Sequence, residues 1–273
     1  MNQLSEKSTK NIFKKYRIQP LKRLGQNFLI DKAAIKKIIE ASNLNSNDIV
    51  LEIGPGSGAL TQELAPKVQK VIAIEKDQRM IEILKEELKD FNNVEVIQGD
   101  ILKNIKFKNK NYKVVGNLPF YLTAPVIRQF LEADNPPKEM ILVVQKEVGQ
   151  RICAKPPKMS ILAVSVQFYS RPEIISYISQ RSFWPSPKVD SAIIKIWLEN
   201  PCTPKINRDL FFKIVKAGFS QPRKQLINNL YRGLKTDKEK AEKWLLKNKI
   251  QPSRRAETLN IEDWVKLTQN FNF

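Results

Sequence analysis

The sequence predicts an α/β protein with a mostly parallel sheet, followed by a small helical domain. From about residue 31, short runs of β-branched residues alternate with stretches whose apolar residues recur every three or four positions. Strands that alternate with helices form parallel sheets through right-handed crossovers. Beyond residue 203 only helical patterns remain.

The first 23 residues are expected to form a mobile basic arm. They contain seven lysines or arginines and a single acid, Glu6, and they show no sustained periodicity. A block of like charge is typical of an arm that binds a polyanion.

Five strands are predicted next: IVLEIG (49–54), KVIAIE (70–75), VEVIQGD (94–100), YKVVGN (112–117) and MILVVQ (140–145). Helices are expected between them, for instance over 59–65 and 77–88. Two later runs, 174–179 and 190–198, flank the proline-containing loop FWPSPKV. They predict a hairpin-like pair at one edge, which makes the sheet mixed.

The end of the chain predicts a separate helical domain. PCTPK (201–205) is a plausible linker, so the sheet domain is expected to span 24–203 and the helical domain 204–273. The helical patterns cover 208–219, 223–234, 237–248 and 261–271.

The charge balance predicts a polyanionic partner. Lysine and arginine number 47 against 28 acids, a net charge of +19, which favours nucleic acid. A membrane surface is the alternative polyanion, but the sequence has no lipidation motif and no basic amphipathic helix rich in Trp and Leu. No apolar run approaches roughly 20 residues and no secretory signal is evident, so a cytoplasmic location is expected.

The residue inventory excludes several chemistries. The chain has no histidine, and its two cysteines, Cys153 and Cys202, lack CxxC spacing. No metal site is therefore expected, and Ser-His-Asp or Cys-His machinery is excluded.

A glycine-rich turn, LEIGPGSGALT (51–61), connects the first strand to a helix. Such a turn lets a nucleoside cofactor approach the backbone closely. Gly54, Gly56 and Ala59 also satisfy the G-x-G-x-x-G/A pattern of dinucleotide-binding turns, and an ordinary tight turn is the third possibility. Glu75, which ends the second strand, suits hydrogen bonding to a ribose under either cofactor.

The tetrapeptide Asn117-Leu118-Pro119-Phe120 is the most informative feature, because it follows a strand at the edge where open α/β sheets bind ligands. The nitrogen of an exocyclic amine is a poor nucleophile, since its lone pair is delocalised into the ring. The Asn117 side-chain oxygen and the Leu118 carbonyl can accept its N–H bonds, while Phe120 offers a face for a base. A strand-terminating turn with a core phenylalanine is the alternative interpretation.

Several motifs together resemble the ribosomal RNA adenine dimethyltransferase family, and they extend over nearly the whole chain. They are GQNFLID (25–31), LEIGPGSGALT, IEKD (74–77), QGD (98–100), NLPF (117–120), FxPxPxVxS (183–191) and RAETL (255–259). RAETL favours the branch that dimethylates two adjacent adenosines near the 3′ end of small-subunit ribosomal RNA over the antibiotic-resistance branch.

The resemblance implies a Rossmann-like class I methyltransferase sheet, the cofactor S-adenosylmethionine and its product S-adenosylhomocysteine. It implies catalytic roles for the NLPF residues, with Phe120 and Phe183 sandwiching a flipped base. One departure is Phe120, where many members carry tyrosine. The residues implied to contact the cofactor or line its pocket are Asn27, Leu29, Gly54, Gly56, Glu75, Lys76, Asp100, Ile101 and Asn117.

The family resemblance further implies ribosomal RNA as the partner, within a small ribosomal subunit or its precursor, and we expect a monomer. Lysines and arginines of the arm, of 146–158 and of 221–232 are candidates for phosphate binding. Phe183 could instead belong to a loop that packs on the sheet.

Three other functions stay open at this stage. They are a binding or assembly factor without turnover, an NAD-dependent dehydrogenase that uses the Gly54 turn, and a resistance-type enzyme acting on large-subunit RNA.

Overall fold

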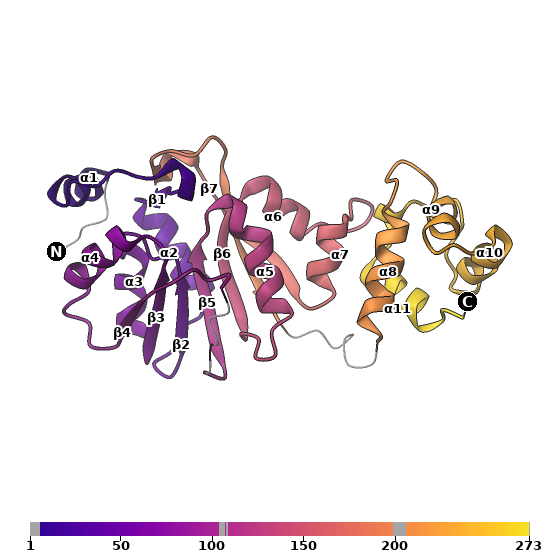
Figure 1. Ribbon diagram of the computed structural model, residues 1–273, viewed down its shortest axis with the longest axis horizontal. Coiled ribbons are helices and arrows are strands. Elements are labelled where there is room, and N and C mark those ends of the chain that lie inside the picture. Colours follow the sequence, from indigo (N-terminus) through magenta and orange to yellow (C-terminus); the bar gives the residue numbers. More distant parts are fainter. Residues whose placement is uncertain (1–5, 104–106, 108, 199–205, 273) are drawn as a thin grey trace. The chain divides into compact units, whose positions relative to one another are not determined.

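The chain folds into two compact units (Figure 1). The computed structural model describes residues 6–103, 107, 109–198 and 206–272. The first unit comprises Met1–Gly149 and Glu173–Leu198, and the second Gln150–Pro172 and Glu199–Phe273. The predicted linker and the boundary at 203 lie outside the described residues.

A seven-stranded sheet with the order β4-β3-β2-β5-β6-β9-β7 forms the centre of the first unit. The first five strands of this order pair in parallel, whereas β9 runs antiparallel to β6. The sheet is therefore mixed, as predicted, and β9 and β7 lie at one edge. The strands are β2 (Ile49–Ile53), β3 (Lys70–Glu75), β4 (Val94–Gln98), β5 (Tyr112–Asn117), β6 (Glu139–Gln145), β7 (Arg171–Ile178) and β9 (Ser191–Trp197).

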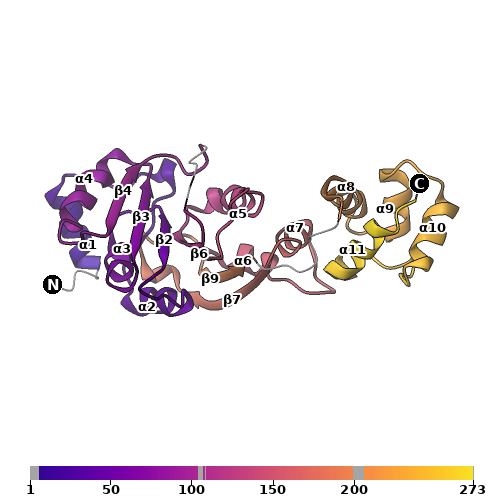
Figure 2. The ribbon, with the colours of Figure 1, turned by 90° about the horizontal axis from the view of Figure 1, so that it is seen from below.

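Helices cover both faces of this sheet (Figure 2). On one face, Val50, Val71 and Val115 form an apolar cluster with side chains of α2 (Lys32–Ala41) and α3 (Ala59–Leu64). Figure 2 shows α5 (Thr123–Leu131) on the opposite side of the sheet from α2. Helix α4 (Gln78–Glu87) follows β3, and α6 (Lys146–Ile152) follows β6. Burial on both faces explains why the central strands are continuous apolar runs.

The prediction of a mobile, aperiodic arm is wrong for residues 6–15. They form helix α1 (Glu6–Lys15), and Phe13 is only 2% exposed. Its ring lies 4.8 Å from that of Phe28 and clusters with Met80 of α4. The helical periodicity of α1 is short and interrupted by lysines, so Phe13 does not stand out in the sequence. Burial of a phenylalanine side chain contributes roughly 1.5–3 kcal/mol to the docking of this helix.

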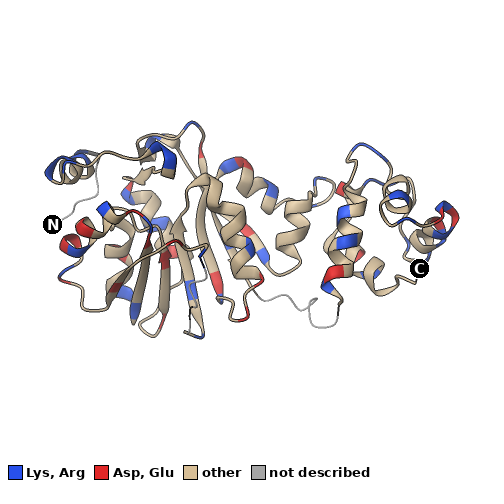
Figure 3. Cartoon of the chain, viewed as in Figure 1, with Lys and Arg blue, Asp and Glu red and all other residues tan. Residues whose placement is uncertain are grey.

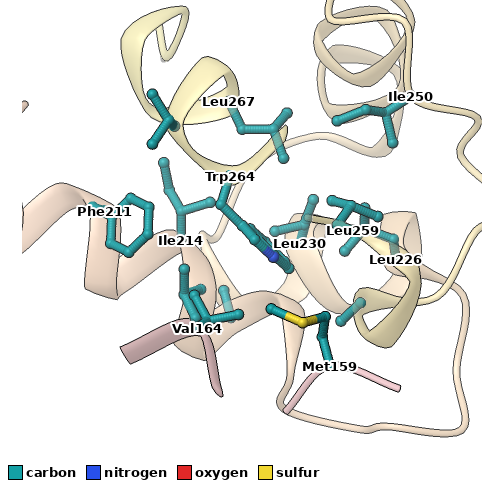
Figure 4. Close-up of a cluster of buried hydrophobic side chains, with 14 of the residues drawn as sticks. Met159, Val164, Phe211, Ile214, Leu226, Leu230, Ile250, Leu259, Trp264 and Leu267 are labelled. Atoms are coloured by element: carbon teal, nitrogen blue, oxygen red, sulfur yellow. The ribbon is translucent and has the colours of Figure 1, made fainter. Parts of the chain in front are cut away.

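The second unit is a helical domain built around Trp264 (Figure 4). This side chain is fully buried, and a Cβ on Gly218 would lie 2.4 Å from its Cη2 atom. Glycine at 218 thus permits the close approach of α8 and α11. The helices are α7 (Ile161–Gln167), α8 (Arg208–Gly218), α9 (Leu226–Gly233), α10 (Lys238–Lys247) and α11 (Ile261–Gln269).

Residues 150–172 belong to this second unit rather than to the sheet domain in which the sequence placed them. The main-chain N–H of Met159 donates to Glu257 O at 3.0 Å. Met159 and Val164 also join the cluster around Trp264 (Figure 4). The assignment depends on these contacts with residues distant in sequence, which local patterns cannot show.

Among the described residues, no helix is long and apolar enough to cross a bilayer.

Candidate active site

The carboxyl ends of the parallel strands surround a cavity in the first unit, and every residue predicted for the site lines it. These residues are Asn27, Leu29, Gly54, Gly56, Glu75, Lys76, Asp100, Ile101, Asn117, Leu118, Pro119, Phe120 and Phe183. They meet because the carboxyl ends of parallel strands lie at one edge of a sheet. Their individual roles remain predictions.

Two glycines shape the turn after β2. Gly54 and Gly56 have φ angles of 67° and 58°, in the left-handed region that favours glycine. A Cβ on Gly56 would lie 2.9 Å from Cε1 of Phe28, whereas a Cβ on Gly54 would meet nothing within 4 Å. Gly56 therefore packs against β1 (Phe28–Leu29), and Gly54 borders open space in the cavity.

Glu75 is fixed by main-chain N–H groups at the end of β3. Its Oε2 accepts from Gly56 at 3.1 Å and its Oε1 from Asp77 at 2.8 Å. Burial raises the pKa of Glu75, and the hydrogen bonds from Asp77 and Gly56 oppose that rise. The remaining lone pairs of a carboxylate held in this way can accept hydrogen bonds from ligand hydroxyls.

Asp100 lies just beyond β4 and is paired with Lys76. The Lys76 Nζ atom is 2.9 Å from Asp100 Oδ2, and the Leu102 N–H donates to Oδ1 at 3.1 Å. The hydrogen bond from Lys76 is the largest influence that lowers the pKa of Asp100. Asp100 is therefore an ionised acceptor at neutral pH, and Lys76 is engaged in holding it.

Asn117, the last residue of β5, is oriented by the segment before β1. Its side-chain nitrogen donates to the Asn27 carbonyl oxygen at 2.9 Å. The opposite atom of the amide, Oδ1, accepts no hydrogen bond from the described part of the chain. The Leu118 N–H donates to Val143 O at 3.3 Å, while no N–H of the described residues donates to the Leu118 carbonyl. Two acceptors are thus available beside the cavity.

The turn after Leu118 presents aromatic side chains. The Leu122 N–H donates to Pro119 O at 2.8 Å, and Phe120–Leu122 form a single 3₁₀ turn. Phe120 is half-buried. Its neighbour Tyr121, which is not among the predicted site residues, is 53% exposed and also lines the cavity.

Phe183 reaches the cavity from β8 (Phe183–Trp184), which pairs antiparallel with β1 so that Phe183 lies opposite Leu29. It is 4% exposed and packs in the apolar cluster with Leu29 and Ile35. The ring therefore makes the packing contacts that the sequence left open, and it still forms part of the cavity wall. Among the described residues, no ring contact joins Phe183 to Phe120.

Glu52 in β2 is another cavity residue that is absent from the prediction. It is 1% exposed, and burial, reinforced by the neighbouring charge of Glu75, raises its pKa to about 8. Its Oε2 has no hydrogen-bond partner in the described part of the chain. An acid within the apolar run IVLEI is the sequence signal that could have found it, because a strand buried on both faces rarely carries a charge without a role.

No group of three or more acidic or cysteine side chains suited to a metal ion occurs among residues 6–103, 107, 109–198 and 206–272. Carboxylates, amide oxygens and aromatic rings line the cavity.

Comparison with known proteins decides the family. The family model described as ribosomal RNA adenine dimethylase matches residues 19–272, almost the entire chain. The chain belongs to this family. It is accordingly an enzyme, an rRNA adenine methyltransferase, and the dehydrogenase alternative is excluded.

Curated relatives are similar over nearly their full length. The chain is 42% identical over 263 residues to "Ribosomal RNA small subunit methyltransferase A" of Dehalococcoides mccartyi, which covers 94% of this chain and 90% of the relative. It is 43% identical over 268 residues to the protein of the same name from Clostridium botulinum, covering 96% and 97%.

Solved structures confirm the Rossmann-like methyltransferase fold. A dimethyladenosine transferase from Plasmodium falciparum superposes with a TM-score of 0.76 at 29% identity, covering 88% of this chain and 95% of that chain. The 23S rRNA methyltransferase ErmE gives a TM-score of 0.75 at 27% identity, covering 89% and 99%. The fold is therefore shared with a dimethyladenosine transferase and with a 23S rRNA methyltransferase.

Proposed function

We propose that this chain dimethylates N6 of two adjacent adenosines near the 3′ end of small-subunit ribosomal RNA, with S-adenosylmethionine as methyl donor. The observation that carries the proposal is the pair of unsatisfied acceptors, Asn117 Oδ1 and the Leu118 carbonyl, at the edge of a cavity lined by Glu75 and Asp100.

The cavity residues fit the donor by their chemistry. The open space beside Gly54 accommodates a ligand against the backbone. Glu75 suits the ribose hydroxyls, and the ionised Asp100 suits the adenine amine. The orphaned Oε2 of buried Glu52 suits an ammonium group, because a buried carboxylate needs a cation or hydrogen-bond donors. When bound, S-adenosylmethionine supplies an electrophilic methyl group on its sulfonium.

Asn117 and Leu118 would activate the target amine by orientation. Each accepts one N–H of the exocyclic nitrogen, which turns its lone pair out of the ring plane and toward the donor. The proton leaves after transfer, when the nitrogen is cationic and acidic, so no general base is required. This is consistent with a chain that has no histidine. Positioning two bound reactants can supply most of the acceleration.

Phe120 and Phe183 would hold the flipped base from two sides. Phe120 is half-buried on the turn after β5, and Phe183 is fixed by the β1–β8 pairing. Stacking tolerates loss of the tyrosine hydroxyl that many relatives have at position 120, because the aromatic face is retained.

The structural similarity to ErmE supports one alternative, methylation of large-subunit RNA. The names of the relatives that are 42–43% identical favour the small subunit. RNA choice in this proposal depends on basic side chains outside the cavity, which are distributed over both units (Figure 3).

The test is transfer of labelled methyl groups to small and large ribosomal subunits that lack dimethyladenosine, followed by mapping of the label. We expect label in two adjacent adenosines of the small subunit. Label confined to the large subunit would support the alternative, and no label on either would overturn the proposal.

A further inference from the structure

A second depression opens beside the catalytic cavity and has a different chemical character. It is a groove of about 840 Å³ between the N-terminal segment and the loop that follows β8. We call it the arm groove. Its wall is formed by α1, by residues of the segment between α1 and β1, and by Trp184 with the loop 185–189, together with Phe120 and Gln145.

The arm groove is continuous with the cavity. Gly25, Gln26, Asn27, Phe120 and Pro187 line both. Phe120, on which the target base would stack, therefore stands where the two meet. A strand that places one nucleotide in the cavity has its neighbour at the mouth of this groove.

The charge of the arm groove is of one sign. Four lysines line it (Lys10, Lys14, Lys22 and Lys188), all exposed, and no acid occurs among the described residues of its wall. Two of the four come from α1 and one from the loop after β8, so folding gathers them from distant parts of the sequence.

Aromatic and apolar surface alternates with these lysines. Trp184 is partly buried, with Phe13 packed edge-on at 5.2 Å between ring centroids. Lys10 Nζ lies 5.8 Å from the Trp184 ring centroid, and Val189 is 45% exposed. Lysines around an aromatic platform are typical of single-stranded nucleic-acid sites, in which cations bind phosphates and rings stack on bases.

The N-terminal segment is held firmly enough to form a wall. The Gln26 side-chain nitrogen donates to Asp77 Oδ2 at 2.8 Å, and Arg79 donates to the Gln19 carbonyl at 3.2 Å. Phe13 is buried against Phe28 and Met80. The groove is thus a feature of the folded unit, not of a free arm.

We propose that the arm groove binds the nucleotide adjacent to the adenosine in the catalytic cavity, with its flanking phosphates on Lys14 and Lys188 and its base near Trp184. The inference rests on the proposed function. It implies that the neighbouring nucleotide occupies the arm groove while one adenosine is methylated. The enzyme would therefore recognise two adjacent nucleotides that are not base-paired.

The test compares Lys14→Gln/Lys188→Gln with Lys67→Gln/Lys89→Gln, which removes the same charge at exposed sites outside both depressions. Binding to unmethylated small subunits is measured against salt concentration, and S-adenosylmethionine affinity is measured without RNA. The salt slope is the slope of the logarithm of the binding constant against the logarithm of salt concentration. For the groove variant we expect its magnitude to decrease by about 1.4, because each of two lost phosphate contacts on a single strand contributes roughly 0.7. Cofactor affinity should be unchanged. The control pair should retain the wild-type slope.

A second arm of the experiment probes the base. The substrate is an unmethylated small subunit assembled with ribosomal RNA in which one of the two adjacent adenosines is replaced by an abasic nucleotide. For the wild-type enzyme we expect the abasic replacement to slow methylation of the remaining adenosine by about fivefold or more. For Trp184→Leu we expect the abasic replacement to slow methylation by a smaller factor. The arm-groove proposal would be overturned if the wild-type enzyme methylated the abasic substrate as fast as the unmodified one and if both double variants had the same salt slope. Absence of methylation of the unmodified small subunit by the wild-type enzyme would instead overturn the proposed function.

Discussion

The side-chain nitrogen of Asn117 donates a 2.9 Å hydrogen bond to the carbonyl oxygen of Asn27, two residues that are distant in sequence. The bond determines which atom of the amide faces the cavity. A nitrogen engaged by a carbonyl leaves the oxygen as the free acceptor, which is the atom that an amine substrate requires. In the proposed mechanism the segment before β1 therefore positions the side-chain oxygen of Asn117.

Asn117→Ala is therefore expected to lower methyl transfer by at least about 100-fold, the usual order for loss of a polar group that acts on the transition state. Unfolding temperature should change little, because Asn117 is only partly buried. Labelled-methyl transfer and thermal unfolding provide the two measurements.

Asn93→Ala is the matched control, since Asn93 donates to Ala65 O and Val68 O outside the cavity. We expect it to cost roughly 1–3 kcal/mol of stability while the folded fraction retains full activity. Normal turnover by Asn117→Ala would remove Asn117 from the mechanism.

Much of the fold was predictable because each local pattern agrees with the tertiary structure. The runs at 70–75 and 112–117 coincide with β3 and β5, since strands buried on both faces are mostly apolar. The site residues were predictable in the same way, because parallel strands bring their carboxyl ends together.

Three features depend on packing that periodicity cannot express. Helix α1 depends on the contact of Phe13 with Phe28 and Met80, which are far away in sequence. Residues 150–172 join the helical unit through the hydrogen bond from Met159 to Glu257. Glu257 belongs to the RAETL motif. Because Ala256 and Leu259 of this motif are buried, the motif forms part of the core of the second unit.

Phe120→Ala should slow methylation without weakening the fold. Loss of base stacking costs roughly 1–3 kcal/mol, or about five- to 150-fold in kcat/KM, while Phe120 is only half-buried. Cofactor affinity, measured by calorimetry without RNA, should change much less than kcat/KM.

Phe183→Ala gives the contrasting case. Phe183 is 4% exposed in the cluster with Leu29, so the substitution should also cost roughly 3–5 kcal/mol of stability. Phe183→Leu separates the two roles, because it retains most of the apolar volume and removes the aromatic face. Equal methylation rates for Phe183→Leu and wild type would assign Phe183 to packing alone.

Glu52 should make stability depend on pH. Burial raises its pKa from 4.5 to about 8, so between these values the folded protein holds a proton that the unfolded chain has released. Stability contributed by this group therefore falls as pH rises through that window. Glu52→Gln removes the titration and should flatten the fall of the unfolding temperature between pH 5 and 8, raising it by several degrees at pH 8.

The same substitution should weaken S-adenosylmethionine binding, because an ammonium group favours the ionised carboxylate. Binding by wild-type enzyme near pH 7 should release a proton, which calorimetry in buffers of different ionisation enthalpy detects, and Glu52→Gln should release none. Unchanged affinity and proton release in the variant would show that Glu52 does not face the cofactor.

Gly54 and Gly56 provide a test of how the cavity is built, since both have left-handed φ angles but different surroundings. Alanine at either position costs about 1–2 kcal/mol for the conformation alone. At position 56 the added Cβ would also lie 2.9 Å from the Phe28 ring, whereas at position 54 it meets no protein atom within 4 Å. Gly56→Ala should therefore lower the unfolding temperature clearly more than Gly54→Ala.

Cofactor affinity should be affected more at position 54 than stability is, because the alanine methyl group would occupy the open space that a ligand would fill. We expect Gly54→Ala to lower S-adenosylmethionine affinity at least tenfold despite its modest effect on stability. If Gly54→Ala binds the cofactor as tightly as the wild type, the ligand does not lie against this turn, and the placement of the whole donor along β2 and β3 would have to be revised.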